Sequence, residues 1–304
     1  MNSSKNTVFW AVVCCLLWST AYPGIKIGLE YTTPLHFAGV RFIISGLMIL
    51  PFTVSLPKYF AMVRDNARLF FLITLFQSVI NYILFYIGMD LVPGAIGAII
   101  VGSQPLFVAV IASIMLHENS LSRQKIFIIA IGIAGVVLVS LGRQGLKLGT
   151  AAELLGVFLI LGANVASGIA NVYVSKAGNS VNPFVLSSFS LFVGGAIIYL
   201  IAIPTEGTIM VPMTAGFGRY WIALGWLSFM SAFAFSVWYL LLQRPGVRVA
   251  DLNFWKFIIP VVGAILSWIM VPDEKPQWLT ILGMVTITLS LILFYRCSHR
   301  NQSC

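Results

Sequence analysis

Charged residues are scarce in this sequence. Its 304 residues include 18 Lys and Arg and only 9 Asp and Glu, so 9% of the chain is charged, against about a quarter in soluble domains. A water-soluble globule of this size would lack the charges that coat a surface, which excludes a cytosolic enzyme, a nucleic-acid-binding module and a disordered chain. With 59% hydrophobic residues and a mean hydropathy of +0.97, the sequence predicts an all-α polytopic membrane protein.

Residues that bind metals or form disulfides are also few. The four cysteines and three histidines show no spacing typical of a disulfide framework, a zinc site or an iron–sulfur site. No glycine-rich phosphate loop is present, which excludes primary pumping by this chain. We therefore expect no metal and no cofactor. The histidines are expected to be isolated residues in loops and interfaces, namely His36, His117 and His299.

Apolar stretches of about 20 residues, enough to cross the hydrocarbon core, recur along the whole chain. They leave only short loops between them, so no extramembranous domain is expected. The first stretch follows Lys5, as in a signal peptide, but no small-x-small cleavage site follows it, and we interpret it as a permanent span. The ten predicted spans are 7–26, 34–55, 69–88, 94–116, 124–141, 153–175, 183–203, 219–242, 249–271 and 277–295.

The distribution of Lys and Arg predicts the orientation, because these residues gather on cytoplasmic loops. With the N-terminus inside, the cytoplasmic segments hold eleven of the 18 cations and the opposite face five, while Arg41 and Lys256 fall within spans. We expect a multi-pass protein of the cytoplasmic (inner) membrane with both termini in the cytoplasm. The expected partners are the lipid bilayer and a small-molecule substrate, without nucleic acid, and a homodimer is left open.

The two halves of the chain show weak internal similarity. Each half has five predicted spans, an odd number, so the second copy would be inserted upside down, as in many secondary transporters. The sequence thus predicts ten transmembrane helices as two inverted five-helix repeats, residues 1–148 and 149–304. Landmarks of the first half recur in the same order roughly 150 residues later: Lys26, Pro34, Pro105 and Glu118 are followed by Lys176, Pro183, Pro260 and Glu274.

Several motifs resemble the EamA-like branch of the drug/metabolite transporter superfamily. The residues that carry the resemblance are Trp18-Ser-Thr-Ala-Tyr-Pro23-Gly-Ile-Lys26, then Pro34, Phe37-Ala38-x-x-Arg41-Phe42, Leu116-His117-Glu118 and Pro272-Asp273-Glu274. The resemblance covers about residues 8–295 and implies ten spans in two inverted repeats around a central cavity, with export of metabolites. His117 and Asp273 replace the family's usual Gly, and Ser190 falls where a second Arg41 would stand.

Polar residues within the spans are the candidates for a substrate path, because each is costly in hydrocarbon without a partner. In span 153–175 polar or small residues recur every three or four positions, which places them on one face of a helix. This face lines a cavity, the interpretation we favour, or it packs closely through interhelical amide bonds. Its members are Asn164, Ser167 or Gly168, Asn171 and Ser175.

The third and fourth spans add further polar positions. Gln77 and Asn81 stand at i, i+4 with Tyr82 beside them, and Gln104 adjoins Pro105. A proline inside a helix frees a backbone carbonyl that protein or water must satisfy. We expect all four polar residues at the substrate cavity.

Lys256 is the most informative single residue. If the ninth helix begins near Arg248, a rise of 1.5 Å per residue places Lys256 about 12 Å deep. If the helix begins at Asp251, Lys256 is only about 7 Å deep and its side chain can snorkel. Arg248 and Asp251 are expected to pair at i, i+3. We favour a cavity cation that binds a carboxylate or another anionic group of the substrate.

The remaining candidates have structural, gating or wall roles. Arg41 matches the family's second-span arginine, and we interpret it as structural, with Glu30 or a freed backbone carbonyl as its partner. The prolines are kinks or flexing gates, and both interpretations stay open. The structural or gating residues are Pro23, Arg41, Pro105, Glu118, Pro260 and Glu274. The aromatic residues that wall the cavity or anchor the chain at the membrane interface are Trp18, Trp238, Tyr239 and Trp255.

Three functions compete for this sequence. The leading hypothesis is a secondary transporter that exports small organic metabolites, such as amino acids or other carboxylated solutes, by alternating access. An intramembrane enzyme needs paired acids, a Ser–His pair or a metal inside the spans, and a channel needs a repeated selectivity loop or a charged ring. Neither pattern is visible, so no enzyme is expected. Within transporters, the alternative is a drug or a nucleotide-sugar or phosphate-type cargo.

Overall fold

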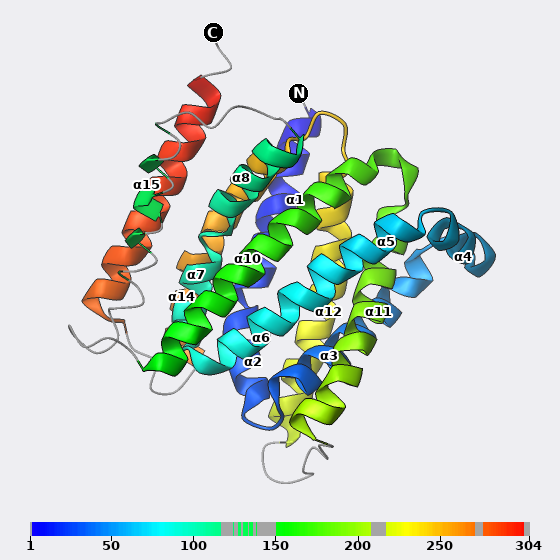
Figure 1. Ribbon diagram of the computed structural model, residues 1–304, viewed down its shortest axis with the longest axis horizontal. Helices are drawn as coiled ribbons and strands as arrows, with labels where there is room; N and C mark the ends of the chain where they lie inside the picture. The colour runs from blue at the N-terminus through cyan, green and yellow to red at the C-terminus, as the bar shows by residue number, and fades with distance from the viewer. Residues whose placement is uncertain are drawn as a thin grey trace.

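The computed structural model describes residues 2–116, 124, 127–128, 130–132, 134–135, 138, 150–207, 217–270 and 276–300. These residues form helices and connecting turns without a strand (Figure 1). Seven of the helical segments are long and apolar enough to cross a membrane. Large apolar side chains stay on the outside, such as Phe158 at 69% and Ile269 at 75% exposed, as expected of a surface that faces lipid. The chain is therefore a helical multi-pass membrane protein, as its composition predicts.

The helices follow the predicted spans closely. The first half contains α1 (Asn2–Ser19), α2 (Ala21–Leu29), α3 (Pro34–Ile49), η1 (Leu50–Phe52), α4 (Leu56–Asp65), α5 (Ala67–Ile73), η2 (Thr74–Ile80), α6 (Asn81–Leu91), α7 (Gly94–Val101) and α8 (Gln104–Leu116). The second half contains α10 (Ala151–Ala177), η4 (Gly178–Ser180), α11 (Pro183–Glu206), α12 (Phe217–Leu242), α13 (Val249–Phe254), η5 (Trp255–Phe257), α14 (Ile258–Met270) and α15 (Trp278–Arg300). Most of span 124–141, together with Glu118 and Glu274, lies outside the described residues.

Four predicted spans are interrupted rather than continuous, the first of them at Thr20, between α1 and α2. A π-helical turn, η2, joins α5 to α6, and the turn at Gly102 and Ser103 separates α7 from α8. A 3₁₀ turn, η5, separates α13 from α14 and contains Lys256. Pro105 is the second residue of α8, where its missing N–H costs no helical hydrogen bond. The fourth span thus breaks before its proline instead of bending at it.

The two halves pack against each other along α3 and α11, which lie side by side (Figure 1). Glycines make the close approach possible. A Cβ at Gly39 would lie 2.7 Å from the Cβ of Tyr199, and one at Gly46 would lie 2.6 Å from the Cβ of Phe192. A Cβ at Gly195 would lie 2.7 Å from the backbone nitrogen of Ile43. Small residues drive helix association in membranes for this reason, since burial of apolar surface supplies no force there.

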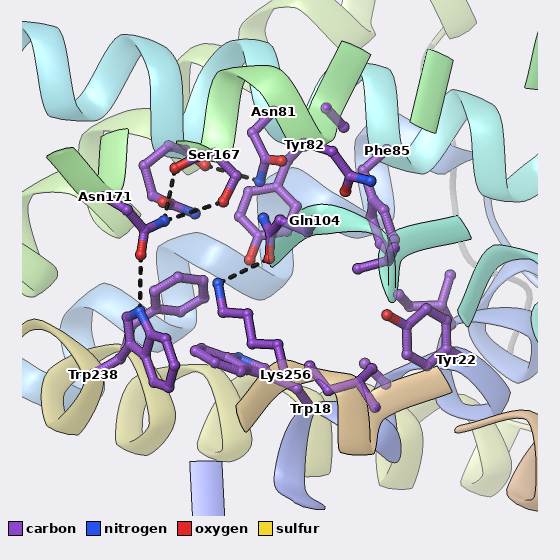
Figure 2. A pocket seen from close by; sticks show the side chains of 18 of the residues that line it. Trp18, Tyr22, Asn81, Tyr82, Phe85, Gln104, Ser167, Asn171, Trp238 and Lys256 are labelled. Atoms are coloured by element: carbon purple, nitrogen blue, oxygen red, sulfur yellow. Dashed lines mark hydrogen bonds between the residues drawn. The ribbon is translucent and has the colours of Figure 1, made fainter. Parts of the chain in front are cut away.

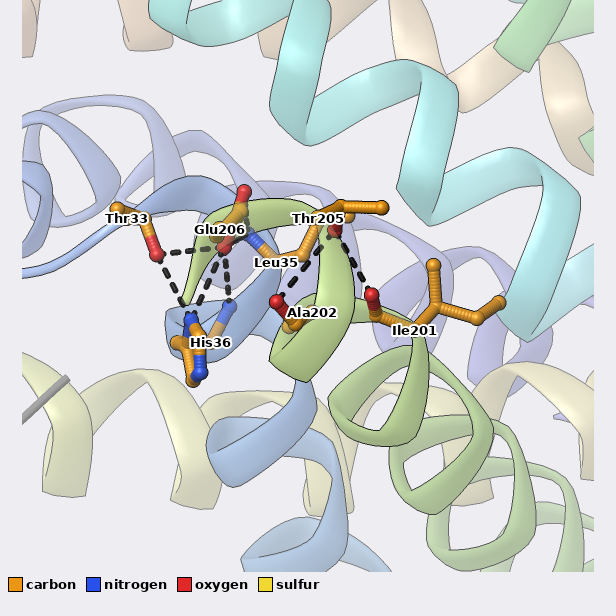
Figure 3. Close-up of polar contacts among 7 residues, drawn as sticks. All are labelled: Thr33, Leu35, His36, Ile201, Ala202, Thr205 and Glu206. Carbon is orange, nitrogen blue, oxygen red and sulfur yellow. Dashed lines mark hydrogen bonds and ion pairs between the residues drawn. The ribbon is translucent and has the colours of Figure 1, made fainter. Parts of the chain in front are cut away.

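A carboxylate from α11 caps the N-terminus of α3 (Figure 3). Glu206 accepts hydrogen bonds from the backbone N–H groups of Leu35 and His36 at 3.0–3.1 Å and from the Thr33 hydroxyl at 2.5 Å. The Nδ1 atom of His36 lies 3.1 Å from the same carboxylate. The expectation that this histidine is isolated is therefore wrong. The sequence conceals the pair because the two residues are 170 positions apart.

Candidate substrate cavity

A cavity lies inside the bundle between the two halves. Its walls come from both ends of the chain, including α1 and α2, α6, α8, α10, α12 and the η5 turn. Its volume is about 90 Å³, which is space for about six to nine water molecules. Apolar surface dominates the lining, and a small set of amide groups and two cations supply the polar contacts. This composition is typical of a small-molecule site.

Lys256 is buried at the centre of this site, with only 5% of the residue exposed (Figure 2). Its ammonium donates a hydrogen bond of 2.8 Å to the side-chain oxygen of Gln104. The same nitrogen lies 4.7 Å from the ring centroid of Trp238 and 5.3 Å from that of Trp18. The rings and one amide oxygen are neutral, so they solvate the ammonium without cancelling its charge.

The start of the ninth span agrees with the deeper of the two predicted positions for Lys256. Arg248 is the residue before α13, and its guanidinium pairs with Asp251 at 2.5 Å. The predicted i, i+3 pair is confirmed. Because the acid is engaged there, it does not neutralise Lys256.

Helix α10 forms hydrogen bonds to the break in the fourth span. The amide of Asn164 donates to the Ile100 carbonyl at 3.0 Å and to the Ser103 hydroxyl at 3.3 Å. The Ser103 hydroxyl also donates to that carbonyl, at 2.6 Å. These bonds satisfy a carbonyl beside the interruption, and the break leaves Gln104 at the first position of α8, facing Lys256. Asn164 therefore lines the cavity and supports its shape at once.

Asn171 links three elements at one end of the cavity. Its side-chain oxygen accepts from the indole N–H of Trp238 at 2.9 Å (Figure 2). The same oxygen accepts from the amide of Asn253 at 3.4 Å. Its amide nitrogen donates to the Ser167 carbonyl at 2.6 Å. This network fixes the Trp238 ring beside the lysine. Asn171 thus lines the cavity and also forms hydrogen bonds between helices, so the two interpretations of the asparagine face do not exclude each other.

The third span contributes its polar groups through the π-helical turn. Gln77 lies within η2, and Asn81 and Tyr82 follow at the start of α6; all three line the cavity. Asn81 donates to the Gln77 carbonyl at 3.1 Å. A π-bulge shifts the helical register by one residue and often marks a functional site. It also leaves the buried hydroxyls of Thr74 and Ser78 without a hydrogen-bond partner among the described residues.

Arg41 is a second cation on the cavity wall, a position that the sequence interpretation did not assign to it. Its guanidinium donates to the Tyr86 hydroxyl at 2.5 Å, the Ser231 hydroxyl at 2.6 Å and the Leu227 carbonyl at 3.3 Å. The predicted backbone-carbonyl partner is thus present. Glu30 is not a partner, because it lies 3.7 Å from Arg219 at the surface.

The cavity brings together most of the predicted substrate residues. On its wall are Lys256, Asn164, Asn171, Gln77, Asn81, Tyr82, Gln104, Trp18 and Trp238. Tyr239 is buried outside the lining and packs edge-on against Phe235, whose ring does line it. Of the two alternatives on α10, Ser167 faces the cavity, whereas a Cβ at Gly168 would lie 2.6 Å from the Ile111 side chain of α8.

Three aromatic residues of the lining were missed by the sequence interpretation. Phe85 stands three positions after Tyr82, and Phe235 stands three positions before Trp238. Residues at i and i+3 share one face of a helix, so this spacing was a usable signal. Tyr22 stands four positions after Trp18, a spacing that also places two residues on one helical face.

The fold and the cavity define a class. The chain is a helical membrane protein with a mostly apolar internal site that holds two cations and several amides, a composition typical of small-molecule sites. No cluster of three metal-binding side chains occurs in the described part of the chain.

Comparison with known proteins gives the family. The model of the EamA-like transporter family matches residues 5–141 and again residues 154–296, so this chain is a membrane transporter of the EamA-like family. The two matches also divide the chain into tandem copies.

Relatives agree with this assignment. The Bacillus subtilis (strain 168) uncharacterised transporter YvbV is 28% identical over 290 residues, which cover 91% of this chain and 88% of the relative. The Escherichia coli (strain K12) uncharacterised inner membrane transporter YedA is 26% identical over 289 residues, covering 92% and 89%. A crystal structure with 16% sequence identity has the same fold, with a TM-score of 0.71 and 97% of both chains covered.

Proposed function

We propose that this protein is a secondary transporter of the cytoplasmic membrane that exports small carboxylated organic metabolites by alternating access. The observation that carries the proposal is the buried ammonium of Lys256, which has a neutral partner, Gln104, at 2.8 Å and faces the central cavity. A buried charge without a counter-charge is costly. A substrate carboxylate supplies the missing charge, so binding is favoured when the anion is present.

The packing of the helices supports two inverted five-helix repeats, 1–148 and 149–304, within ten spans. In the first copy the first span consists of α1 and α2; its counterpart in the second copy is α10. Helix α1 packs against α12 and α14, which belong to the eighth and ninth spans. Helix α10 packs against α6 and α8, which belong to the third and fourth. The first span of each copy thus packs on the third and fourth spans of the opposite copy. Two copies related by a two-fold axis have such reciprocal contacts.

The two interrupted helices support alternating access around this site. Gln104 begins the second part of the fourth span, and Lys256 lies in the turn that divides the ninth, its counterpart in the other repeat. Discontinuous helices at the interface of two repeats form the substrate sites of many transporters. Such turns also allow each half-helix to tilt on its own. Pro105 and Pro260 fit this arrangement as residues near the starts of α8 and α14.

The test is transport by the pure protein in liposomes. A panel of labelled metabolites, anionic, zwitterionic, neutral and cationic, is offered with and without a pH gradient. We expect saturable uptake or exchange of carboxylated members above that of protein-free vesicles. Stimulation by a pH gradient would show proton coupling, and a gradient-independent exchange would show an exchanger. Failure to move any member of a broad panel, with protein that is folded and inserted, would refute the proposal.

A further inference from the structure

The charges that line the cavity are all of one sign. Its walls contain Lys256 and Arg41, and no carboxylate stands among those lining residues that the structure describes. Both cations are buried, with 5% and 2% of the residue exposed. Their hydrogen-bond acceptors are an amide oxygen, two hydroxyls and a backbone carbonyl, all of which are neutral. The site thus holds two positive charges that the described protein does not balance.

The acids of the described residues lie outside this site, at the ends of helical segments or in the surface helix α4. The six described acids are Glu30, Asp65, Asp90, Glu153, Glu206 and Asp251. Four of them are engaged elsewhere: Asp251 with Arg248, Asp65 with Arg64, Glu206 with the start of α3, and Glu30 with Arg219. In this structure the described acids therefore do not balance the two cations of the cavity.

Aromatic side chains form much of the apolar lining of the cavity. Rings of Trp18, Trp238, Tyr82, Phe85 and Phe235 line it, and the faces of the two tryptophans already flank the ammonium of Lys256. Aromatic rings can attract a cation, but here a second ammonium would approach the first one. In a low-dielectric site that repulsion is strong. The rings therefore suit an apolar, ring-bearing body.

From these observations we infer that the cargo is a small organic anion with an apolar, ring-bearing body and no ammonium group. Amino acids are then poor substrates, because their ammonium adds a third positive charge for which the cavity has no carboxylate. The inference rests on the proposed function and narrows its substrate class. The inference concerns only the charge and shape of the cargo. Transport by the protein can therefore be demonstrated even if the cargo proves to be of another class.

Four ligands test the inference, and three of them share one carbon skeleton. 3-Phenylpropanoate and phenylalanine differ only by the α-ammonium, 3-phenylpropanamide is the neutral analogue, and butanoate keeps the charge but lacks the ring. Binding to the purified protein is measured by calorimetry and by quenching of tryptophan fluorescence, since Trp18 and Trp238 flank the site. We expect 3-phenylpropanoate to bind at least tenfold more tightly than each of the other three.

Variants of Lys256, with a control variant of the surface residue Lys58, separate charge recognition from a general loss of folding. In Lys256→Met and Lys256→Gln the advantage of 3-phenylpropanoate over 3-phenylpropanamide should fall to less than threefold. Lys58→Met, which removes an exposed cation of α4, should leave it unchanged. Equal or tighter binding of phenylalanine would overturn the inference, as would the absence of binding by all four ligands. If the liposome panel then shows transport of amino acids or neutral solutes, the inference fails while the transporter stands.

Discussion

The ammonium of Lys256 meets the side-chain oxygen of Gln104 at 2.8 Å, and each residue stands at an interruption of its own helix. The two helices come from opposite copies of the tandem repeat. An arriving carboxylate can take the place of Gln104 beside the ammonium, because an amide oxygen is a weaker partner for a cation than an ionised oxygen. Under the proposed function, a hydrogen bond between the two repeats would be exchanged for a bond to the cargo, and occupancy of the cavity would then be coupled to the contact between its walls.

Replacing Lys256 by methionine should abolish recognition of anionic cargo while preserving the fold. Methionine keeps most of the side-chain length, and removing a buried charge relieves its desolvation cost. We expect the kcat/KM for carboxylated substrates to fall at least tenfold and the thermal unfolding midpoint in detergent to stay or rise. Lys58→Met is the matched control on the surface. Native transport of an anion by Lys256→Met would show that the lysine does not contact cargo.

Replacing Gln104 by glutamate should block the cavity with an internal ion pair. The new carboxylate would lie where the amide oxygen now accepts from Lys256. Because it competes with the substrate anion for the same ammonium, the apparent affinity for anionic cargo should fall at least tenfold. Gln104→Met, which removes the amide without adding a charge, should weaken binding much less. Equal losses in both variants, measured by calorimetry, would indicate that Gln104 acts through packing alone.

Single cysteines on α10 should report which of its faces the cavity uses. In a variant without Cys14, Cys15, Cys297 and Cys304, we expect Asn164→Cys and Ser167→Cys to react with a membrane-impermeant thiol reagent and substrate to slow the reaction. Gly168→Cys should stay unreactive, because that position faces Ile111 of α8.

Asn171→Cys serves as the fourth position of this series. Its side chain lines the cavity but is also bonded to Trp238, so we expect labelling together with a loss of stability. Labelling is followed by mass spectrometry with the carrier in both orientations. Uniform inertness of positions 164, 167 and 171 would mean that this face only packs.

The sequence predicted those parts of the molecule that depend on local composition. Long apolar runs locate the helices. Lys256 stands out as the cation within the ninth span, because a charged side chain in hydrocarbon is costly and usually has a functional role. The i, i+3 pair of Arg248 and Asp251 depends on helical spacing alone and is confirmed. The cavity collects residues that share one helical face, such as Asn164 and Asn171.

The parts that the sequence did not reveal depend on contacts between distant segments. The interruption before Gln104 is supported by Asn164, which bonds the Ile100 carbonyl from 64 positions away. His36 was interpreted as isolated because its partner Glu206 lies near the end of another helix. Arg41 lines the cavity because Tyr86 and Ser231 hold it there, and neither partner shares its helix.

Replacing Tyr86 by phenylalanine should destabilise the protein without removing a cavity cation. The hydroxyl accepts a hydrogen bond of 2.5 Å from the buried guanidinium of Arg41. Hydrogen bonds to charged groups contribute about 1.5–3 kcal/mol, and we expect a loss of ~2 kcal/mol in the free energy of unfolding. Tyr31→Phe is the control, because that hydroxyl makes no hydrogen bond within the described part of the chain. Unchanged stability of Tyr86→Phe in detergent would contradict the structural role of this bond.

Reporter fusions should place both termini in the cytoplasm. The start of α1 and the end of α15 point toward the same end of the bundle (Figure 1). Arg244, which follows α12, donates to the Thr7 hydroxyl at 2.9 Å, so a second basic segment lies beside the start of α1. Cations on cytoplasmic loops favour this orientation.

A fluorescent reporter that matures only in the cytoplasm should be bright at either terminus. A tag inserted at Thr32, between α2 and α3, should be accessible from outside. Termini on opposite faces would mean an odd number of spans, and the two inverted five-helix repeats would then be wrong.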